Sequence, residues 1–453
     1  MSPAEKAFSK KVRPLAEKLI NHAMTSGKSQ GISDVRVAIY SAEEQENKIE
    51  KGEVIDITTG SNQQITVTLF SGDKVLTFTK NSFDEGTLCE AIDQNIQAIH
   101  VVPENTDKRL LESSKVYKGQ KEALDLYDKK QPNYQELINY AKEIEASAAA
   151  QPNIKGSRSV DISSQVTHKF VLATNGFDYV SSGTLYRASA GVVAEDKSGM
   201  QIGYDYSMAR HFSDMAHPKE IGKKAAENAI AKLGAVLPNT ADMPIVLSPE
   251  AAASFFSAVY SAISGSNVYK GTTFLKGKVG QQVMSKGITL IDNPRVKKGV
   301  SSSCIDASGF EAKKITFIKD GVLKSYNYGL LESRQLGLEP IGRDGGLTNS
   351  SVLPGKQTPE ELMADIKDGI YIKGFTGGSV DVNDGIHSRQ AQGLMIKDGK
   401  ITDVAVDGFV VSGNLKEMFM NVSLANDTAN LPNNKTAFVV PTTRINGVLI
   451  AGK

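Results

Sequence analysis

Histidine and carboxylate side chains are the groups best suited to bind a metal ion or carry a proton, and few of them stand at useful spacings here. The chain has six histidines. His211 and His217 are six residues apart, so they do not share one helix face as a helical zinc site requires. His387 follows Asp381 and Asp384 in a glycine-rich stretch, which is typical of a solvated loop. His387 is nevertheless kept as a candidate cleft residue.

Cysteine and serine nucleophiles give a similarly open result. Cys304 follows three consecutive serines and is a candidate thiol nucleophile in a cleft, although a partly buried structural thiol is the more common role. No G-x-S-x-G elbow and no G-x-x-x-x-G-K-[ST] loop occurs, so neither a hydrolase triad nor a phosphate loop is predicted. The glycines between Gly374 and Gly378 predict a bend or bulge between strands.

Composition narrows the class of protein further. Lys+Arg 52 against Asp+Glu 51 leaves a net charge of +1, so no bulk charge recruits nucleic acid or an anionic membrane. No run of about 18 apolar residues is present, and the first residues lack the apolar segment of a secretory signal. Two cysteines far apart exclude a disulfide framework and a cysteine-rich zinc site. We therefore expect a cytoplasmic protein without nucleic-acid or membrane partners and without a cofactor.

The elements that would position these residues fall into three units of an α+β fold. Residues 1–102 predict an N-terminal α/β domain of helix, strands and helix. Residues 103–240 predict a polar arm, a helix and a β-meander that a second helix closes. Residues 241–453 predict a β-rich C-terminal domain, in which Ser248 and Pro249 start a helix that runs to about residue 264.

Short turn signals divide the strand-rich stretches into hairpins. Four Asx-Gly pairs each stand between apolar runs, which is the pattern of a two-residue hairpin turn. They are Asn175-Gly176, Asp320-Gly321, Asp398-Gly399 and Asn446-Gly447.

Several stretches together resemble the TldD/PmbA family, also called modulators of DNA gyrase. Each piece is short, but their order and spacing along nearly the whole chain match the family. The stretches are Lys51–Val54, Arg210 with His217–Glu220 and Lys223–Ala226, Ser248–Gly265, Thr273–Leu275 with Val279-Gly280, Lys319–Leu323, Thr348-Asn349 with Leu353–Gly355, Gly369–Tyr371, Gly377–Asp381, Gly413–Leu415 and Ala425–Asp427.

The resemblance implies a cytoplasmic protease assembly of two related subunits. The TldD-type subunit carries H-E-x-x-x-H on the helix that opens the C-terminal domain, with a later cysteine as a further zinc ligand. The PmbA or TldE type lacks this set. In this chain the motif window holds Ser257, Ala258 and Ala262, and the cysteine position falls near Thr436. None of these side chains can replace imidazole, carboxylate or thiolate on zinc.

The resemblance therefore predicts a non-catalytic subunit of the PmbA/TldE type. Its expected partner is a TldD-type metalloprotease subunit, or a second copy of itself. The assembly would degrade or mature extended peptides in an interior cavity. Two alternatives stay open. One is a stand-alone hydrolase that uses Cys304 or His387, and the other is a regulator that binds peptides or gyrase without a protease partner.

Overall fold

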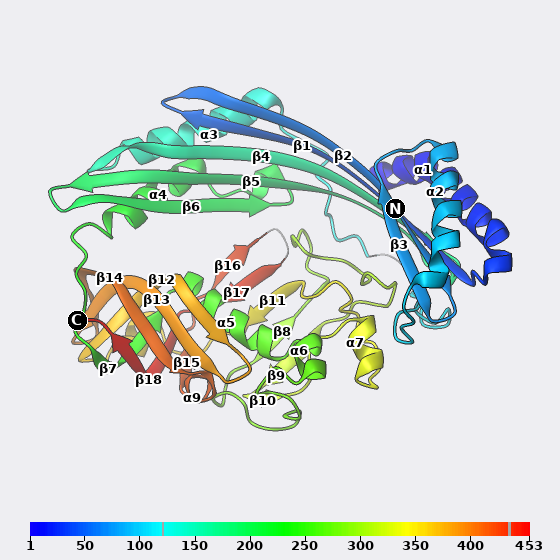
Figure 1. Cartoon of the computed structure of the whole chain (residues 1–453). Helices are drawn as coiled ribbons and strands as arrows, with labels where there is room; N and C mark the ends of the chain where they lie inside the picture. Colours follow the sequence, from blue (N-terminus) through cyan, green and yellow to red (C-terminus); the bar gives the residue numbers. More distant parts are fainter. Residues whose placement is uncertain (120–121, 434–435) are drawn as a thin grey trace.

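The computed structural model describes residues 1–119, 122–433 and 436–453. A long curved sheet lies above a C-terminal domain, with the N-terminus near one end of the sheet and the C-terminus in the domain below (Figure 1). Helices and sheets occur in both parts, which confirms the α+β class. No helix within the described ranges combines the length and the apolar character needed to cross a membrane.

The long sheet has six antiparallel strands in the order β3-β2-β1-β4-β5-β6. Their bounds are β1 (Asp34–Glu50), β2 (Glu53–Ser71), β3 (Lys74–Lys80), β4 (Ile154–Ala173), β5 (Asp178–Asp196) and β6 (Gly199–Ala209). Strand β1 pairs with β4 from Arg36–Ala173 to Ile49–Val160. The sheet therefore continues across residue 102, and the division of the first 240 residues into two domains stays a prediction.

Helices cover one face of this sheet. Helices α1 (Pro3–Ser26) and α2 (Glu85–Ala98) pack on alternate residues of β1 such as Val35 and Val37 at one end. Helices α3 (Tyr134–Ala149) and α4 (Pro218–Ile230) pack on Ile49 and its neighbours at the other end. Three short 3-10 turns, η1 (Lys28–Gln30), η2 (Ile99–Val101) and η3 (Phe212–Asp214), connect these elements.

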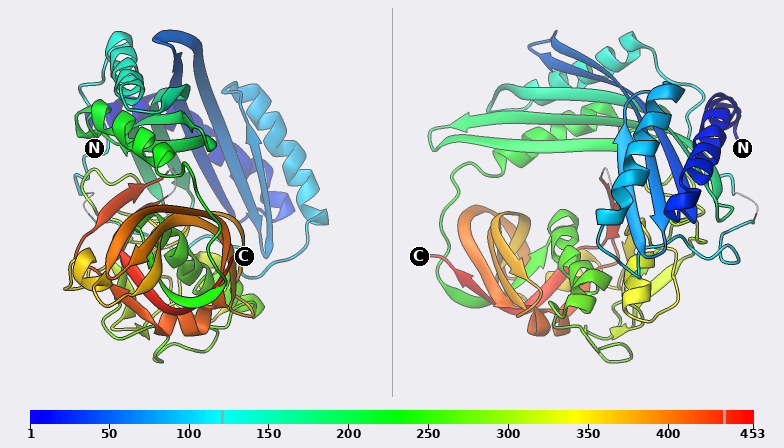
Figure 2. Two further views of the ribbon diagram at one scale, coloured as in Figure 1. Left: turned by 90° about the vertical axis from the view of Figure 1, so that its left-hand side faces the viewer. Right: turned by 45° about the vertical axis from the view of Figure 1, so that its right-hand side comes forward.

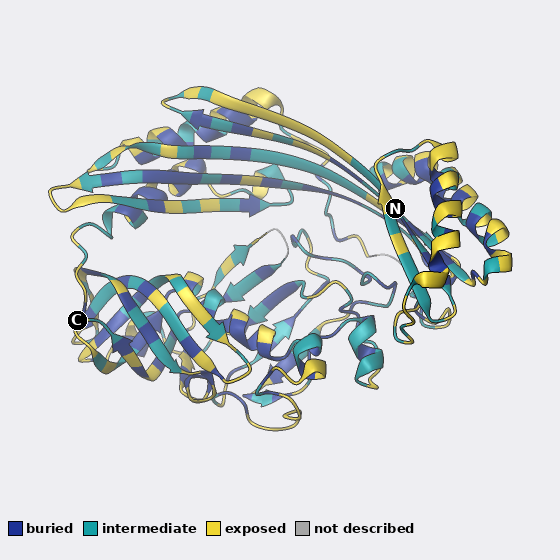
Figure 3. Ribbon diagram, in the orientation of Figure 1, coloured by how far each residue is buried: buried dark blue, intermediate teal, exposed yellow. Residues whose placement is uncertain are grey.

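The opposite face of the sheet, here called the inner face, is turned toward the C-terminal domain. Its residues alternate with the buried ones and are mostly polar: β1 contributes Arg36, Glu44 and Glu46, and β4 contributes Lys169 and Asp161. The half of β2 that follows the Lys51-Gly52 turn is largely exposed (Figure 3). The inner face thus offers polar groups instead of a second hydrophobic layer.

The C-terminal domain contains two more six-stranded sheets. One has the order β10-β9-β8-β11-β17-β16, and the other has the order β14-β13-β12-β7-β18-β15. In the second sheet β14 also pairs with β18, so its strands close into a ring whose curvature is visible in Figure 2. The strands are β7 (Ala241–Leu247), β8 (Leu290–Asp292), β9 (Ile315–Lys319), β10 (Val322–Leu323), β11 (Asn349–Val352), β12 (Asp368–Asp381), β13 (Ile386–Lys397), β14 (Lys400–Asn414), β15 (Val422–Leu424), β16 (Ala429–Pro432), β17 (Ala437–Val440) and β18 (Thr443–Ala451).

Five helices complete the described part of this domain, and the first of them lies in its core. They are α5 (Pro249–Ala262), α6 (Gly265–Lys270), α7 (Leu330–Gln335), α8 (Pro359–Met363) and α9 (Leu415–Met420). Helix α5 contacts β7 and β12 of one sheet and β16 and β17 of the other. Its apolar residues, including Phe255, Phe256 and Val259, belong to the largest hydrophobic cluster.

The turn predictions succeed with one exception. Asn175-Gly176, Asp320-Gly321 and Asp398-Gly399 each connect paired strands, and both residues of the last two pairs have positive φ as a type I′ turn requires. The hairpin predicted at Asn446-Gly447 is wrong. This pair lies inside β18, at a bulge in the pairing of β18 with β7. A bulge also uses glycine with positive φ, so the two cases share one sequence signal.

Candidate functional site

Helix α5 begins where the sequence predicts. Ser248 accepts a hydrogen bond from the Ala251 N–H through its Oγ, and Pro249 occupies the first turn. Positions on one side of the helix are apolar and buried, whereas Ser257 and Ser261 are exposed on the other. The helix is therefore held by its packing and presents a narrow serine-bearing stripe outward.

The three positions where the resemblance places a zinc motif differ in burial and do not face one common space. Ser257 is exposed, and its Oγ donates to the carbonyl oxygen of Ser254 at 2.6 Å. Ala258 and Ala262 are 5% and 0% exposed and belong to the hydrophobic core. The methyl groups at these two positions fill packing space. They offer no lone pair to a metal ion.

Thr436 lies next to the same helix in the fold, although it is far away in sequence. It precedes β17, whose Phe438 ring lies 5.6 Å from the ring of Tyr260 on α5. The Thr436 N–H donates to Asn433 Oδ1 at 2.9 Å. Thr436 therefore stands at the start of a strand that contacts α5. However, the described residues contain no group of three His, Cys, Asp or Glu side chains arranged to hold a metal ion, so this donor set does not fit zinc.

His387 lies in strand β13 and not in a loop, so the loop prediction is wrong. It is 1% exposed, and its ring packs edge-on against Phe255 and Phe375. Its Nδ1 lies 3.1 Å from the carbonyl oxygen of Val411. Burial, opposed by the Val411 hydrogen bond, lowers the pKa of His387 to about 4. The imidazole is neutral at pH 7 and acts as a packed core residue in the described structure.

Cys304 is also buried, in a different part of the molecule. Its side chain is 2% exposed, and its Sγ lies 3.9 Å from the carbonyl oxygen of Glu122 in the connecting arm. His387, by contrast, lies next to Val411 of β14 and between two phenylalanine rings of the C-terminal domain. The structure does not assemble the two candidates into one nucleophile–base pair.

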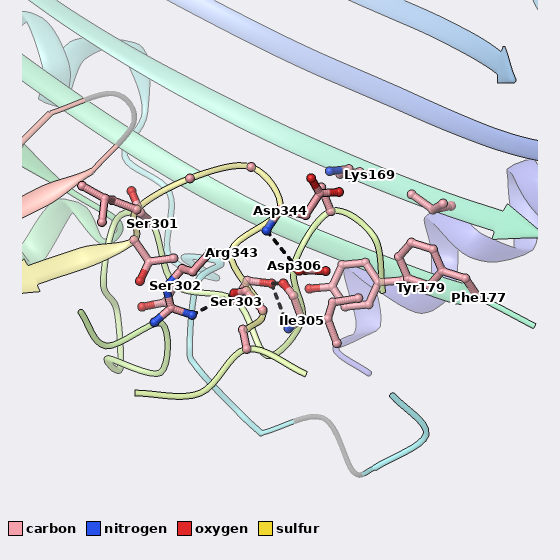
Figure 4. A pocket seen from close by; sticks show the side chains of 18 of the residues that line it. Lys169, Phe177, Tyr179, Ser301, Ser302, Ser303, Ile305, Asp306, Arg343 and Asp344 are labelled. Carbon is pink, nitrogen blue, oxygen red and sulfur yellow. Dashed lines mark hydrogen bonds between the residues drawn. The ribbon is translucent and has the colours of Figure 1, made fainter. Parts of the chain in front are cut away.

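A cavity of about 360 Å³, here called the junction cavity, lies between the long sheet and the C-terminal domain. Figure 4 shows Lys169 of β4, Tyr179 of β5 and Phe177 of the turn between these strands together with loop residues of the C-terminal domain, among them Asp306, Arg343 and Asp344. Arg36 and Arg210 also line it. No sequence pattern indicates this site, because its residues come from separate segments that only the folded chain brings together.

The junction cavity is rich in charge. Asp306 accepts hydrogen bonds from the N–H groups of Ser308, Phe310 and Asp344 and from the Ser308 hydroxyl. Burial raises the pKa of Asp306, and burial with the neighbouring Asp306 raises the pKa of Asp344. Burial lowers the pKa of Arg210 to about 10. The Arg210 guanidinium donates to the carbonyl oxygens of Thr184 and Val300.

Arg343 is the most buried cation of this region, and it is paired. Its Nε lies 2.7 Å from Asp292 Oδ2, and both side chains are fully buried. Asp292 also accepts hydrogen bonds from the Thr348 N–H and hydroxyl and from the Ser350 hydroxyl. This pair fixes the loop that follows Arg343 and so shapes one wall of the junction cavity.

A second hollow, of about 400 Å³, lies on the inner face of the sheet farther along β4. Glu44, Glu46 and Asp161 line it with Arg187 and with smaller polar residues. We call it the polar hollow. Both spaces lie on the inner face of the sheet, and charged side chains line each of them.

Comparisons with known proteins agree along most of the chain. Residues 127–233 match the model of the PmbA/TldA metallopeptidase central domain, and residues 240–452 match that of the PmbA/TldA metallopeptidase C-terminal domain. A metalloprotease PmbA homolog of Buchnera aphidicola subsp. Acyrthosiphon pisum is 34% identical over 54% of this chain and 55% of its own length. This chain thus spans about half of that relative. A metalloprotease PmbA homolog of Buchnera aphidicola subsp. Baizongia pistaciae is 31% identical over 71% of each chain.

Solved structures share the whole fold. A protein of Bacteroides thetaiotaomicron named as a modulator of DNA gyrase superposes with a TM-score of 0.87 and 24% identity, covering 96% of this chain and 99% of that one. TldE from Thermococcus kodakarensis superposes with a TM-score of 0.82 and 21% identity, covering 96% and 100%. With the sequence matches, these likenesses lead to one conclusion: the chain belongs to the TldD/PmbA family.

Proposed function

We propose that this chain is a non-catalytic subunit of a TldD-type metalloprotease assembly that degrades or matures extended peptides. The proposal rests on the side chains that occupy the zinc-motif positions of α5. The family fold is present, yet Ser257 is exposed, and Ala258 and Ala262 are packed into the core. In the part of the chain that the structure describes, no three His, Cys, Asp or Glu side chains are arranged to hold a metal ion. Because the three motif positions supply neither a zinc ligand nor a general base, hydrolysis would need the catalytic helix of a partner subunit.

The inner face gives the subunit a way to contribute to peptide handling. Strand β6 forms one edge of the long sheet, and its Tyr204 and Tyr206 are exposed. An extended peptide can add to such an edge through main-chain hydrogen bonds. Lys224 of α4 lies 3.5 Å from Glu250 of α5, so this edge is held close to the start of α5. We propose that the peptide path passes through this space and that the assembly is cytoplasmic.

Reconstitution tests the proposal. The purified full chain is mixed with a TldD-type subunit from the same host, and the mixture is analysed by size-exclusion chromatography and by a peptidase assay with and without chelator. We expect a complex whose peptidase activity exceeds that of the TldD-type subunit alone and is lost with chelator. Separate elution with no gain in activity would refute the proposed role, and association of the chain only with itself would favour the homodimer.

Metal analysis of the purified chain is the companion measurement. We expect no stoichiometric zinc, since the α5 positions provide no ligand. A tightly bound equivalent of zinc would contradict the proposal.

A stand-alone peptide-binding regulator is the second candidate, and one observation favours it. The junction cavity and the polar hollow are both complete within a single chain. Peptide binding by the isolated chain, in a host without an H-E-x-x-x-H paralogue, would support this candidate. A hydrolase that uses Cys304 has weaker support because the thiol is buried; cleavage by the isolated chain that a thiol blocker stops and a chelator does not would revive it.

A further inference from the structure

Two cations of the long sheet reach the junction cavity with spare hydrogen-bonding capacity. Lys169 is an exposed residue on the inner face of β4 that also lines the cavity. Within the described residues its Nζ makes no hydrogen bond and no ion pair within 4 Å, although Asp344 favours its charged form and Arg36 opposes it. Arg36 on β1 donates through Nη2 to the Ala307 carbonyl oxygen at 2.8 Å, and its buried Nε has no hydrogen-bond partner. Arg210 adds a third positive charge, and its Nε is likewise buried without a partner.

The carboxylates around the cavity do not use up this capacity. Asp306 is occupied by the four hydrogen bonds from Ser308, Phe310 and Asp344 described above. Asp344 accepts a hydrogen bond from the Leu330 N–H and forms no ion pair within 4 Å in the described part of the chain. Arg343 is paired with Asp292, so the other charged residues that line the cavity are three cations and two carboxylates. Glu332, which accepts a hydrogen bond from the Gly329 N–H, adds a negative charge near Asp344 from outside the lining. The unpartnered donors of Lys169, Arg36 and Arg210, rather than the overall charge, favour an anionic ligand.

The surroundings indicate what carries the anion. Lys169 and Gln165 lie four residues apart on the same face of β4, which is about 13 Å at the usual rise per residue. Gln165 lines the polar hollow, so a ligand with one end at Lys169 has an accessible polar surface leading away from it. An extended polypeptide suits this shape. A small free anion would use only the cavity.

We propose that the junction cavity binds the C-terminal carboxylate of an extended peptide, with Lys169 and Arg36 as its donors. The inference rests on the proposed function, because it names the end of the peptide that this subunit recognises. No bond is made or broken in this step. The carboxylate replaces water around Lys169, and the chain runs from there along the inner face toward the polar hollow.

Peptide pairs that differ only at the C-terminus test the inference on the full chain. An eight-residue peptide with uncharged side chains and an N-terminal fluorescein is prepared as the free acid and as the amide, and binding is followed by fluorescence anisotropy. The variants are Lys169→Gln, which removes the charge, and Lys169→Arg, which keeps it. The matched control is Lys48→Gln, because Lys48 lies on the same inner face of β1 but outside both hollows.

We expect wild type to bind the free acid about 10- to 100-fold more tightly than the amide, as one charge-assisted hydrogen-bond pair provides. Lys169→Gln should abolish this preference, whereas Lys169→Arg and Lys48→Gln should keep it. Equal binding of acid and amide would overturn the inference while leaving the proposed function in place. Failure of both peptides to bind would overturn it as well, and so would equal losses in Lys169→Gln and Lys48→Gln.

Inorganic phosphate forms the last arm of the experiment. It is titrated into the complex of wild type with the free-acid peptide. If the cavity binds the C-terminal carboxylate of a peptide, we expect phosphate to displace the peptide only weakly and only at high phosphate concentration. Tight phosphate binding that Lys169→Gln weakens, with no preference for the free-acid peptide, would assign the cavity to a phosphate and refute the peptide terminus. Because reconstitution with the TldD-type subunit is measured separately, the two proposals fail in distinguishable ways.

Discussion

Replacing His387 by leucine should change the pH dependence of stability more than the stability itself at neutral pH. The pKa of His387 in the folded chain is about 4 because the ring is buried between Phe255 and Phe375. An unfolded histidine has a pKa of about 6.5. Below pH 6.5 the histidine is therefore protonated in the unfolded state but remains neutral in the folded state until the pH approaches 4. Wild type consequently loses stability as the pH falls.

The magnitude follows from the two pKa values. At pH 5 the lost stability is about 2 kcal/mol, and it approaches about 3 kcal/mol below pH 4. His387→Leu removes this loss, since leucine does not titrate and fills a similar volume. At pH 7.5 the variant should be less stable than wild type by about 1 kcal/mol, because the hydrogen bond near the Val411 carbonyl is gone. At pH 5 we expect the order to reverse.

Urea unfolding followed by circular dichroism at pH 7.5 and pH 5 measures the effect. The control is His100→Leu, which removes an exposed imidazole from the N-terminal part. The quantity of interest is the difference between variant and wild type at the two pH values. Parallel pH dependence of wild type and His387→Leu would refute the conclusion that His387 is a neutral core residue and would return it to the list of functional candidates.

Three further substitutions probe the packing around the site. Asp292→Ala should lower the free energy of unfolding by about 3–5 kcal/mol in urea titrations, because it leaves a buried guanidinium unpaired; a loss under 1 kcal/mol would contradict this. Gly222→Ala should cost about 1–3 kcal/mol, since the new Cβ would lie 2.1 Å from a carbonyl oxygen of α3, whereas the control Gly60→Ala has open space and should be neutral. Ala262→His should lower the melting temperature by several degrees because the site is fully buried, and Ser257→His should not; equal effects would show that α5 is not packed as described.

Much of the local structure was predictable because it depends on short-range signals. The Ser248-Pro249 start of α5 works through a side-chain cap and a fixed φ, both of which depend only on neighbouring residues. The Asp320-Gly321 and Asp398-Gly399 turns work in the same way, through their positive φ values. The bulges of β12 around Gly374 and Gly377 also match the prediction for that glycine-rich stretch.

The lengths of the strands were not predictable from residue alternation. The pattern indicates a strand over Val35–Tyr40, yet β1 continues to Glu50. The alternation is interrupted at Glu43, Glu44 and Glu46, where neither face of the strand is buried, and it resumes only with the buried Asn47 and Ile49. What keeps it extended is main-chain pairing with β2 and β4 on both sides, and such long-range pairing leaves no local pattern.

The candidate site shows the same limit. The residue types of Cys304 and His387 make them candidates in the sequence, and the structure buries both. The junction cavity was not predicted, because in the sequence Arg36 and Lys169 resemble ordinary polar residues of exposed strands. Their importance comes from the loop of Asp306 and the loop of Asp344, which approach them only after the two parts of the chain fold together.

The continuous pairing of β1 with β4 has a consequence for shortened forms of the protein. A chain that began at residue 127, where the match to the central domain starts, would lack β1 and β2. Strand β4 would then present unpaired main-chain groups from Val160 to Ala173 to solvent. A long exposed strand of this kind is a template for addition of another chain. We expect such a fragment to aggregate, so the first two strands protect the rest of the sheet from self-association.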